Sequence, residues 1–194
     1  MPSPLDEFVP TYDAREYFQI RVNAPAELVY QIAAHFDLDS IPLVHGIFWL
    51  RTKLMAGGAV PSQPFAEGLI AGAKRLGWGA LSEVPGRLFV AGAYCQPWYA
   101  QVTFHPLAAD TFSPFAEPGQ VKIAWTLEAS PLDAARSLLA TETRAIATDP
   151  WARRHFRRYW AWARFGIFPI RWLLLPAVRR QAEREARLRA AKAV

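Results

Sequence analysis

Glu142 and Arg144 are two residues apart in a segment whose pattern is typical of a β-strand, so their side chains share one face of it. If that face points inward, a carboxylate and a guanidinium meet in a region of low dielectric. There they pair with each other or present a polar anchor to a ligand. If the face points outward, or if the pair is buried only for packing, the two side chains serve structure alone. The sequence leaves both interpretations open.

Other side chains capable of acid–base or nucleophilic chemistry are scattered. Cys95 and His105 lie among the expected strands, but neither has a partner nearby in the sequence. The histidines show neither the spacing nor the cysteine partners of a metal site. The segment "GLIAGAKRLGWG" lacks the Gly-Lys-Ser/Thr order that binds phosphates. The sequence therefore identifies no catalytic residues, and we expect no metal and no cofactor.

The chain carries more large aromatic side chains than core packing normally requires, with 8 Trp and 12 Phe in 194 residues. Large rings fill small gaps poorly, so a surplus of rings favours an internal cavity or a groove. The alternative is a tryptophan-rich core that the rings fill completely. Together with Glu142 and Arg144, the residues that we expect to line a cavity are Phe18, Tyr94, Trp98, Trp125, Phe156, Tyr159 and Trp160.

The segment "RRHFRRYWAWARFGIFPIRWLLL", residues 153–175, combines these rings with arginines. At helical spacing its apolar residues form one stripe, and the arginines lie on the flanks and the opposite side. Burial of each large apolar side chain stabilises by about 1.5–3 kcal/mol, which exceeds what a surface arginine contributes. We therefore predict a helix that begins at Asp149-Pro150 and docks on the concave face of a sheet. A kink is expected at Gly166 and Pro169.

Alternation and capping signals predict the remaining elements. Residues 16–22 alternate apolar and polar side chains, which is typical of a half-buried strand. A helix is expected over residues 23–36, with Asn23 as its N-cap. The other expected elements are a helical passage over 40–54, a loop over 55–64, two strands in 77–94, and single strands over 99–107, 120–130 and 135–149.

This order of strand, helices, antiparallel strands and a long terminal helix predicts an α+β fold. The length fits one domain, 1–194, with an N-terminal extension at 1–12 and a C-terminal helical segment at 150–190. A single cysteine excludes an intrachain disulfide. No signal peptide is visible, and the longest apolar stretch, 14 residues over 165–178, is too short to span a bilayer. We therefore expect a cytoplasmic protein.

The net charge of +5 is divided unevenly along the chain. Residues 151–194 hold twelve Lys and Arg against two Glu and carry +10, whereas residues 1–150 hold ten against fifteen acids and carry −5. Such asymmetry indicates an acidic partner or the solvated face of a long helix. An anionic membrane is one such partner, contacted through the apolar residues 172–175 and nearby arginines. A nucleic acid is not expected, because no binding motif is present.

Three segments, in this order, resemble the START-like or SRPBCC superfamily of helix-grip proteins, which includes polyketide cyclases. They are "IRVNAPAELVYQIAAHFD", "GWGALSEVPGRLFVAGAYCQPW" and "TETRAIATDPWARRHFRRYW". The resemblance implies a curved antiparallel sheet wrapped around the C-terminal helix, with a hydrophobic cavity between them. It transfers no catalytic residue, because members share the fold and differ in chemistry.

The resemblance and the surplus of rings together predict a START-like domain that binds a small hydrophobic molecule, lipid-like or aromatic, in this cavity. The alternative is an enzyme of the polyketide cyclase or aromatase type, in which a polar group such as Glu142, Arg144 or Tyr94 moves protons. A third hypothesis is association of the basic helix with an anionic membrane surface. The identity of the ligand and the oligomeric state stay open.

Overall fold

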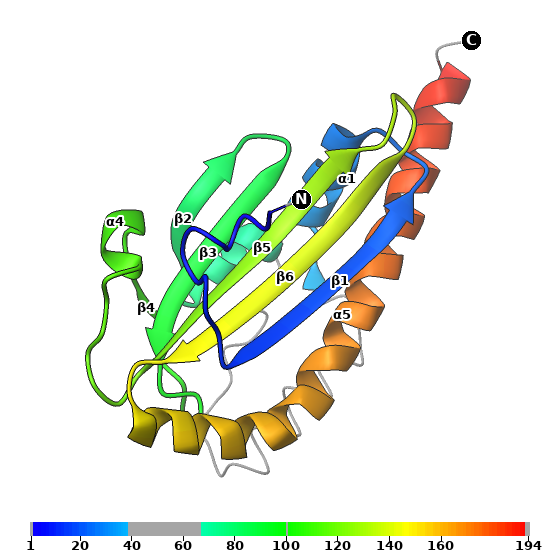
Figure 1. Cartoon of the computed structure of the whole chain (residues 1–194). Coiled ribbons are helices and arrows are strands. Elements are labelled where there is room, and N and C mark those ends of the chain that lie inside the picture. Colours follow the sequence, from blue (N-terminus) through cyan, green and yellow to red (C-terminus); the bar gives the residue numbers. More distant parts are fainter. Residues whose placement is uncertain (1, 39–66, 100, 193–194) are drawn as a thin grey trace.

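The computed structural model describes residues 2–38, 67–99 and 101–192, except for the side chains of residue 162 and residues 164–171. Within these ranges, helices pack on one twisted antiparallel sheet (Figure 1). The strands are β1 (Ala14–Val22), β2 (Gly79–Val84), β3 (Leu88–Cys95), β4 (His105–Pro106), β5 (Val121–Pro131) and β6 (Ser137–Ala147). The helices are α1 (Ala26–Ala34), α3 (Leu69–Arg75), α4 (Ala109–Phe112) and α5 (Pro150–Lys192). The predicted α+β class is confirmed.

The sheet has the order β1-β6-β5-β3-β2, and β4 pairs with β3 outside this path. Most of the predicted strands are confirmed, because β1, β5 and β6 lie within or overlap the segments 16–22, 120–130 and 135–149. The strand expected over 99–107 is wrong apart from the two residues of β4. Phe104 in this segment stacks on Trp78, with 4.7 Å between ring centroids, and this packing takes the place of a longer strand pairing.

The main core lies between one face of the sheet and the helices α1 and α5. Side chains alternate along a strand, so every second residue of β5 and β6 points to this face. Leu127 of β5 and Leu139 of β6 are buried there against Val29 of α1 and Val178 of α5. A sheet whose inner face holds the long terminal helix is the helix-grip arrangement that we predicted (Figure 1).

The opposite face of the sheet is covered by the N-terminal segment. Leu5, Phe8 and Val9 are buried at 0%, 6% and 1% exposure, in a second core with Val90 and Phe112. Residues 5–9 are therefore part of the packing on this face, because their apolar side chains would otherwise be exposed to water. They lie within residues 1–12, the segment that we predicted as an N-terminal extension of the domain.

The helix α5 is 43 residues long and begins as predicted. The Asp149 carboxylate accepts hydrogen bonds from the backbone N–H groups of Trp151 at 2.7 Å and Ala152 at 2.8 Å, while Pro150 takes the first helical position. The first and the last turns of the helix run in different directions (Figure 1). The kink predicted at Gly166 and Pro169 falls on residues whose side chains lie outside the described part.

The start of α1 differs from the prediction. Its first residue is Ala26, and Pro25 precedes it without a side-chain cap. Asn23 is too far from the first turn to cap it, and donates from its backbone N–H and its side-chain amide to the Glu183 carboxylate, both at 3.1 Å. This contact joins the β1–α1 turn to the last turns of α5.

Some predicted elements lie elsewhere. The helical passage over 40–54 and the loop over 55–64 are outside the described residues. The helix α3 was not predicted.

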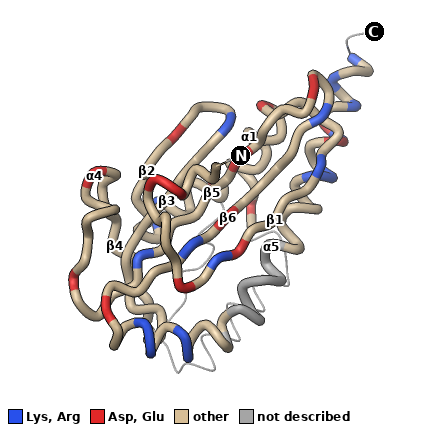
Figure 2. Tube along the Cα trace, in the orientation of Figure 1, with Lys and Arg blue, Asp and Glu red and all other residues tan. Residues whose placement is uncertain are grey.

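In the described part of the chain, no helix combines the length and the apolar character needed to cross a bilayer. Figure 2 shows Lys and Arg at both ends of α5, as the charge distribution along the sequence predicts.

Candidate functional site

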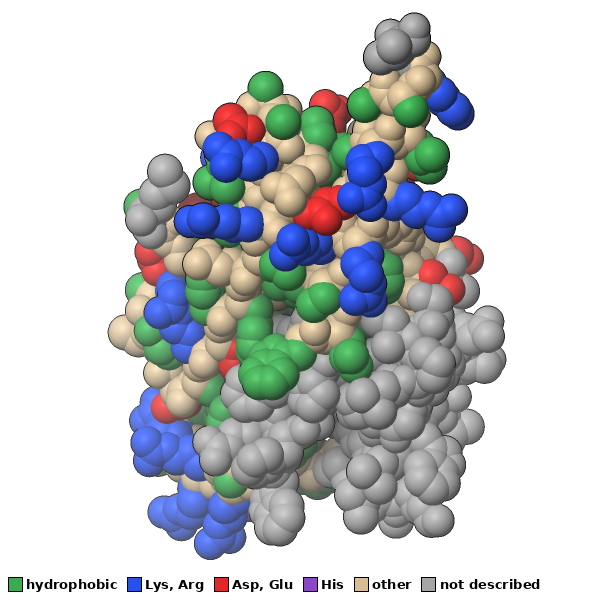
Figure 3. Space-filling model, turned by 90° about the vertical axis from the view of Figure 1, so that its right-hand side faces the viewer, with side chains coloured by type: hydrophobic (Ala, Val, Ile, Leu, Met, Phe, Trp, Pro, Cys, Tyr) green, Lys and Arg blue, Asp and Glu red, His purple; other side chains and the backbone are tan. Residues whose placement is uncertain are grey.

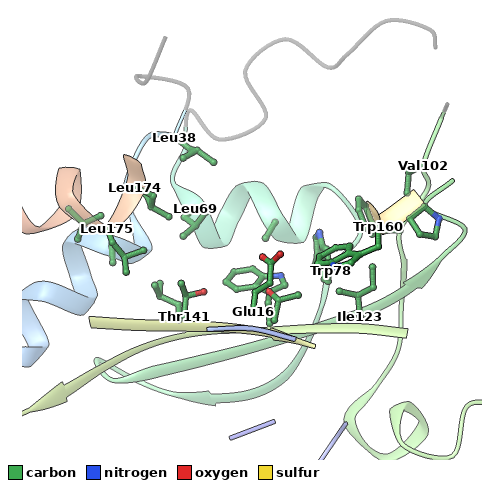
Figure 4. Close-up of a pocket in the computed structure, with 18 of the residues that line it drawn as sticks. Glu16, Leu38, Leu69, Trp78, Val102, Ile123, Thr141, Trp160, Leu174 and Leu175 are labelled. Carbon is green, nitrogen blue, oxygen red and sulfur yellow. The ribbon is translucent and has the colours of Figure 1, made fainter. Parts of the chain in front are cut away.

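A cavity of about 270 Å³ lies between the inner face of the sheet and the helices α3 and α5. Its floor is made by side chains of the central strands: Ile123, Trp125, Leu127, Leu139, Thr141 and Thr143. Leu69 of α3 lies opposite this floor (Figure 4), and Ala73 of the same helix is also part of the wall. The cavity is therefore enclosed by elements that are distant in the sequence and that only the folded sheet brings together.

Aromatic rings form one end of the cavity. Trp78 stacks on Phe104 and meets Trp125 edge-on, with 6.2 Å between the centroids and 80° between the ring planes. Trp125 in turn meets the ring of Phe89 at 5.7 Å. Rings held at these angles to one another are restrained by their neighbours. They present a rigid apolar surface to whatever occupies the cavity.

The helix α5 contributes to the cavity from turns that are far apart along it: Phe156, Tyr159, Trp160, Leu174, Leu175 and Val178. Phe156 is 1% exposed, and its ring lies 5.6 Å from that of Trp160. Because residues 18 apart on a helix are five turns apart, Phe156 and Leu174 face the same side. The apolar stripe predicted for this helix is thus part of the cavity wall.

Three polar side chains interrupt the apolar floor. Glu16 of β1 is 5% exposed, and Thr141 and Thr143 of β6 lie beside it in the sheet. Glu16 is paired directly with Thr143 in the β1–β6 register, and Thr143 is paired with Trp125 in the β5–β6 register. Figure 4 shows the Glu16 carboxylate rising from the floor into the cavity, near Thr141 and Ile123. A buried acceptor group therefore faces an apolar space.

Four of the predicted cavity residues, Trp125, Phe156, Tyr159 and Trp160, lie on the cavity wall. That they contact a ligand stays a prediction. Phe18 points to the same face of the sheet and packs against the main core, but it does not reach the cavity. The rings do not fill the interior completely, which was the alternative that the sequence left open.

Glu142 and Arg144 do not line the cavity, which corrects the prediction. They do share a face of β6, with 2.7 Å between a Glu142 Oε atom and Nε of Arg144, but this face lies away from α5. Ser3 donates to Glu142 at 2.6 Å, and Arg15 pairs with the same carboxylate at 2.7 Å. Asp6 accepts from Arg144 at 2.7 Å. The pair thus holds the N-terminal segment on the sheet.

The physical reason for this correction is the alternation of β6. The sequence "TETR" places threonines on one face and the charged pair on the other, and both faces are buried. Burial raises the pKa of Glu142, but hydrogen bonds from Ser3, Arg144 and Arg15 outweigh it and lower the pKa below its ordinary value. The carboxylate is therefore held ionised, which suits an ion pair and not a proton donor.

Tyr94 and Trp98 are also not among the residues of the cavity wall. Tyr94 points to the outer face of β3, where its ring stacks between His105 at 4.9 Å and Phe115 at 4.3 Å. Trp98 packs against Trp151 of α5 at 5.7 Å, in a third apolar cluster with Phe156. Tyr94 is on the outer face because side chains alternate along β3. Trp98 lies in the turn after β3 and therefore does not follow that alternation.

Sequence reasoning missed Glu16, Thr141 and Thr143. For Glu16 a signal existed, because it continues the alternation of Phe18, Ile20 and Val22 and so falls on their face of β1. For Thr141 and Thr143 the sequence held no such signal, since either face of β6 could have pointed inward. In the described part of the chain, no group of three His, Cys, Asp or Glu residues is arranged to hold a metal ion.

The curved sheet, the long helix and the cavity between them define a helix-grip α+β protein. No protein-family model matches the chain, and no curated protein matches it in sequence. Among solved structures, the di-domain ARO/CYC BexL from the BE-7585A biosynthetic pathway is similar, with 14% identity and a TM-score of 0.32. The match covers 86% of this chain and 45% of BexL, so the chain spans less than half of that protein. A similarity of this size transfers no function.

Proposed function

We propose that this protein binds a small hydrophobic molecule, lipid-like or aromatic, in the cavity between the sheet and α5. The observation that carries the proposal is the cavity itself, about 270 Å³, whose described wall is mostly apolar, with Glu16, Thr141 and Thr143 as polar residues. A core whose purpose is stability alone is packed with few voids larger than a water molecule. Keeping such a space open costs stability, and a ligand that fills it recovers the lost contacts.

The volume limits the size of the ligand. Typical ligand pockets have volumes of about 300–1,000 Å³, so this cavity is at the small end of the range. An apolar cavity of about 150 Å³ in another protein holds one benzene ring. A molecule of two fused rings, or an alkyl chain of similar bulk, is therefore the expected scale of the ligand.

Binding of 2-methylnaphthalene, measured by isothermal titration calorimetry, tests this proposal. Saturable binding to the wild type is expected. Ala73→Phe places a ring in the cavity from α3, where Ala73 is 3% exposed, and is expected to lower the affinity at least tenfold. Ala116→Phe, at an exposed site, is the matched control and should leave the affinity unchanged. Circular dichroism would check that both variants fold. Absence of binding to the folded wild type would overturn the proposal.

The cyclase or aromatase alternative needs a group in the cavity that can move a proton. The residues first considered for this role, Glu142, Arg144 and Tyr94, lie outside it. Among the described wall residues, the titratable side chains are Glu16 and Tyr159. Conversion of a polyketide-like substrate by the wild type and its loss in Glu16→Gln would favour the enzyme, whereas retention of the substrate without turnover favours a binding protein.

A second candidate function, contact with an anionic membrane, is favoured by one exposed side chain. Trp172 of α5 is 69% exposed although its neighbours Leu174 and Leu175 are buried. Exposed arginines follow it along the helix at positions 180, 184 and 187. Lys and Arg gather over the last turns of α5 (Figure 3). An aromatic ring beside a row of arginines matches the interface of an anionic bilayer.

Co-sedimentation with lipid vesicles tests this contact. The wild type is expected to bind vesicles that contain phosphatidylserine and not vesicles of phosphatidylcholine alone. Arg180→Glu combined with Arg184→Glu should abolish binding. The control is Arg75→Glu combined with Arg87→Glu, which changes the net charge by the same amount outside α5. This control should not abolish vesicle binding. Equal binding to both kinds of vesicle would exclude this function.

A further inference from the structure

We propose that Glu16 selects the ligand, and that the cavity takes an apolar molecule carrying a hydrogen-bond donor, with a protonated amine preferred over a hydroxyl. This inference rests on the proposed binding function and adds a chemical class to it. The juxtaposition that carries it is a buried carboxylate on the floor of an otherwise apolar cavity. Two threonine side chains flank that carboxylate.

The first support is the chemistry of the carboxylate. Glu16 is 5% exposed, and on the described part of the wall it is the only charged side chain. An ionised carboxylate only accepts hydrogen bonds, and its two oxygens offer about four acceptor positions. It can therefore accept from a ligand in addition to contacts within the protein. In a region of low dielectric, a donor from the ligand is stabilised strongly and a second negative charge is repelled.

The second support is the position of the polar group within the floor. The row Glu16, Thr143, Trp125 runs across three strands, because these residues are paired in register. Along the strands the wall becomes apolar on both sides, toward Ile123 in one direction and Leu139 in the other. Figure 4 shows Glu16 near the middle of the view, with Thr141, Leu174 and Leu175 on one side of it and Ile123, Trp160 and Val102 on the other.

This position has a consequence for the shape of the ligand. A donor that reaches Glu16 has apolar wall on both sides of it, so the ligand carries apolar parts on both sides of its polar group. A fatty acid with a terminal carboxylate fits poorly, since it would bring a like charge to Glu16. A ring system or chain with an amine or hydroxyl substituent at an inner position fits well.

A series of naphthalene compounds that differ in one group tests the inference on the wild type alone. The compounds are 2-methylnaphthalene, 2-naphthylmethylamine, 2-naphthalenemethanol and 2-naphthoic acid. The expected order of affinity is amine, then alcohol, then acid, with the amine at least about tenfold tighter than the acid, because a hydrogen bond to a charged group is worth about that factor. Equal affinities for the amine and the acid would overturn the inference.

Glu16→Gln then assigns the preference to this residue. The variant should lose the preference for the amine over the acid. Glu128→Gln is the matched control, because Glu128 lies on β5 of the same sheet and accepts a hydrogen bond from Ser130 on the face away from the cavity. It should retain the full preference. If the wild type binds none of the compounds, the proposed function fails; if it binds 2-methylnaphthalene without any preference among the others, only this inference fails.

Discussion

The side chains of Glu142 and Arg144 lie 2.7 Å apart on the outer face of β6, and both are almost fully buried, at 3% and 4% exposure. Arg15 and Ser3 complete the hydrogen bonds of the carboxylate, and Asp6 pairs with the guanidinium. The network connects residues that are 127 and 139 positions apart in the chain. Its position beneath the N-terminal segment gives it a structural role that is separate from the cavity.

Glu142→Gln is therefore expected to destabilise the protein without changing ligand binding. Loss of the Glu142 charge leaves the buried Arg144 guanidinium with Asp6 as its remaining ionic partner, so the cost is expected to stay below the about 3–5 kcal/mol typical of a buried pair that loses its only partner. The free energy of unfolding in urea measures this loss. Asp133→Asn, which breaks an exposed pair with Arg136, is the control and should have little effect. A loss of affinity for 2-methylnaphthalene in the folded variant would contradict the assigned role.

The same network predicts a dependence of stability on pH. The pKa of Glu142 is lowered in the folded state, so its contribution is fully present above the pKa of the unfolded chain and is lost as the pH falls through the folded value. The difference in stability between the wild type and Glu142→Gln should therefore shrink as the pH is lowered below about 4.5. Urea titrations at several pH values between neutral and acidic would show whether the two curves converge.

Phe8→Ala tests whether the N-terminal segment belongs to the core. Phe8 is 6% exposed and meets the ring of Phe112 edge-on at 6.3 Å. Truncation of a buried phenylalanine costs about 3–5 kcal/mol, so a large fall in the urea midpoint is expected. Leu132→Ala, at a leucine that is 51% exposed, should change stability by no more than about 0.5 kcal/mol. Equal effects of the two substitutions would mean that the segment is dispensable.

Asp149→Ala is expected to weaken the start of α5. The carboxylate accepts from the backbone N–H groups of Ala152, Gly119 and Trp151, and these bonds lower its pKa. Its contribution is thus present above the ordinary pKa of an aspartate and disappears as the pH falls through the lowered value. The variant should unfold at lower urea than the wild type at pH 7, and at similar urea near pH 2. A constant gap across this range would argue against the cap.

Gly77→Ala is expected to affect both stability and the cavity. Gly77 has a φ of +98°, and an added Cβ would collide with the backbone carbonyl of Phe104. Relief of that collision displaces Phe104 from its stack on Trp78, so affinity for 2-methylnaphthalene should fall together with the urea midpoint. Gly86→Ala is the control: its φ is +72°, but a Cβ there meets only the Glu27 side chain at 3.4 Å. The free energy of unfolding of Gly86→Ala should fall by about 1–2 kcal/mol, and its affinity for 2-methylnaphthalene should stay unchanged.

Local pattern was sufficient for most of the elements around the cavity. The alternation of Phe18, Ile20 and Val22 predicts β1, and the Asp149-Pro150 pair predicts the start of α5, because strand and helix periods and caps are properties of neighbouring residues. This dependence on neighbouring residues also explains why the strand predicted over 99–107 was wrong. Phe104 finds its partner in Trp78, which is 26 positions earlier, and no pattern within 99–107 records that contact.

Only the tertiary structure decided which side of the sheet encloses the cavity. On β6 the threonines and the charged pair alternate, so a strand period of two is satisfied whichever face turns inward. The choice is made by two distant segments: residues 3–9 bring partners for Glu142 and Arg144 to one face, and α5 brings its apolar stripe to the other. The sequence by itself therefore determined most of the strands, the Asp149 cap of α5 and the amphipathic character of that helix. Which residues meet a ligand depends on contacts across more than 100 positions, because burial is a property of the assembled layers.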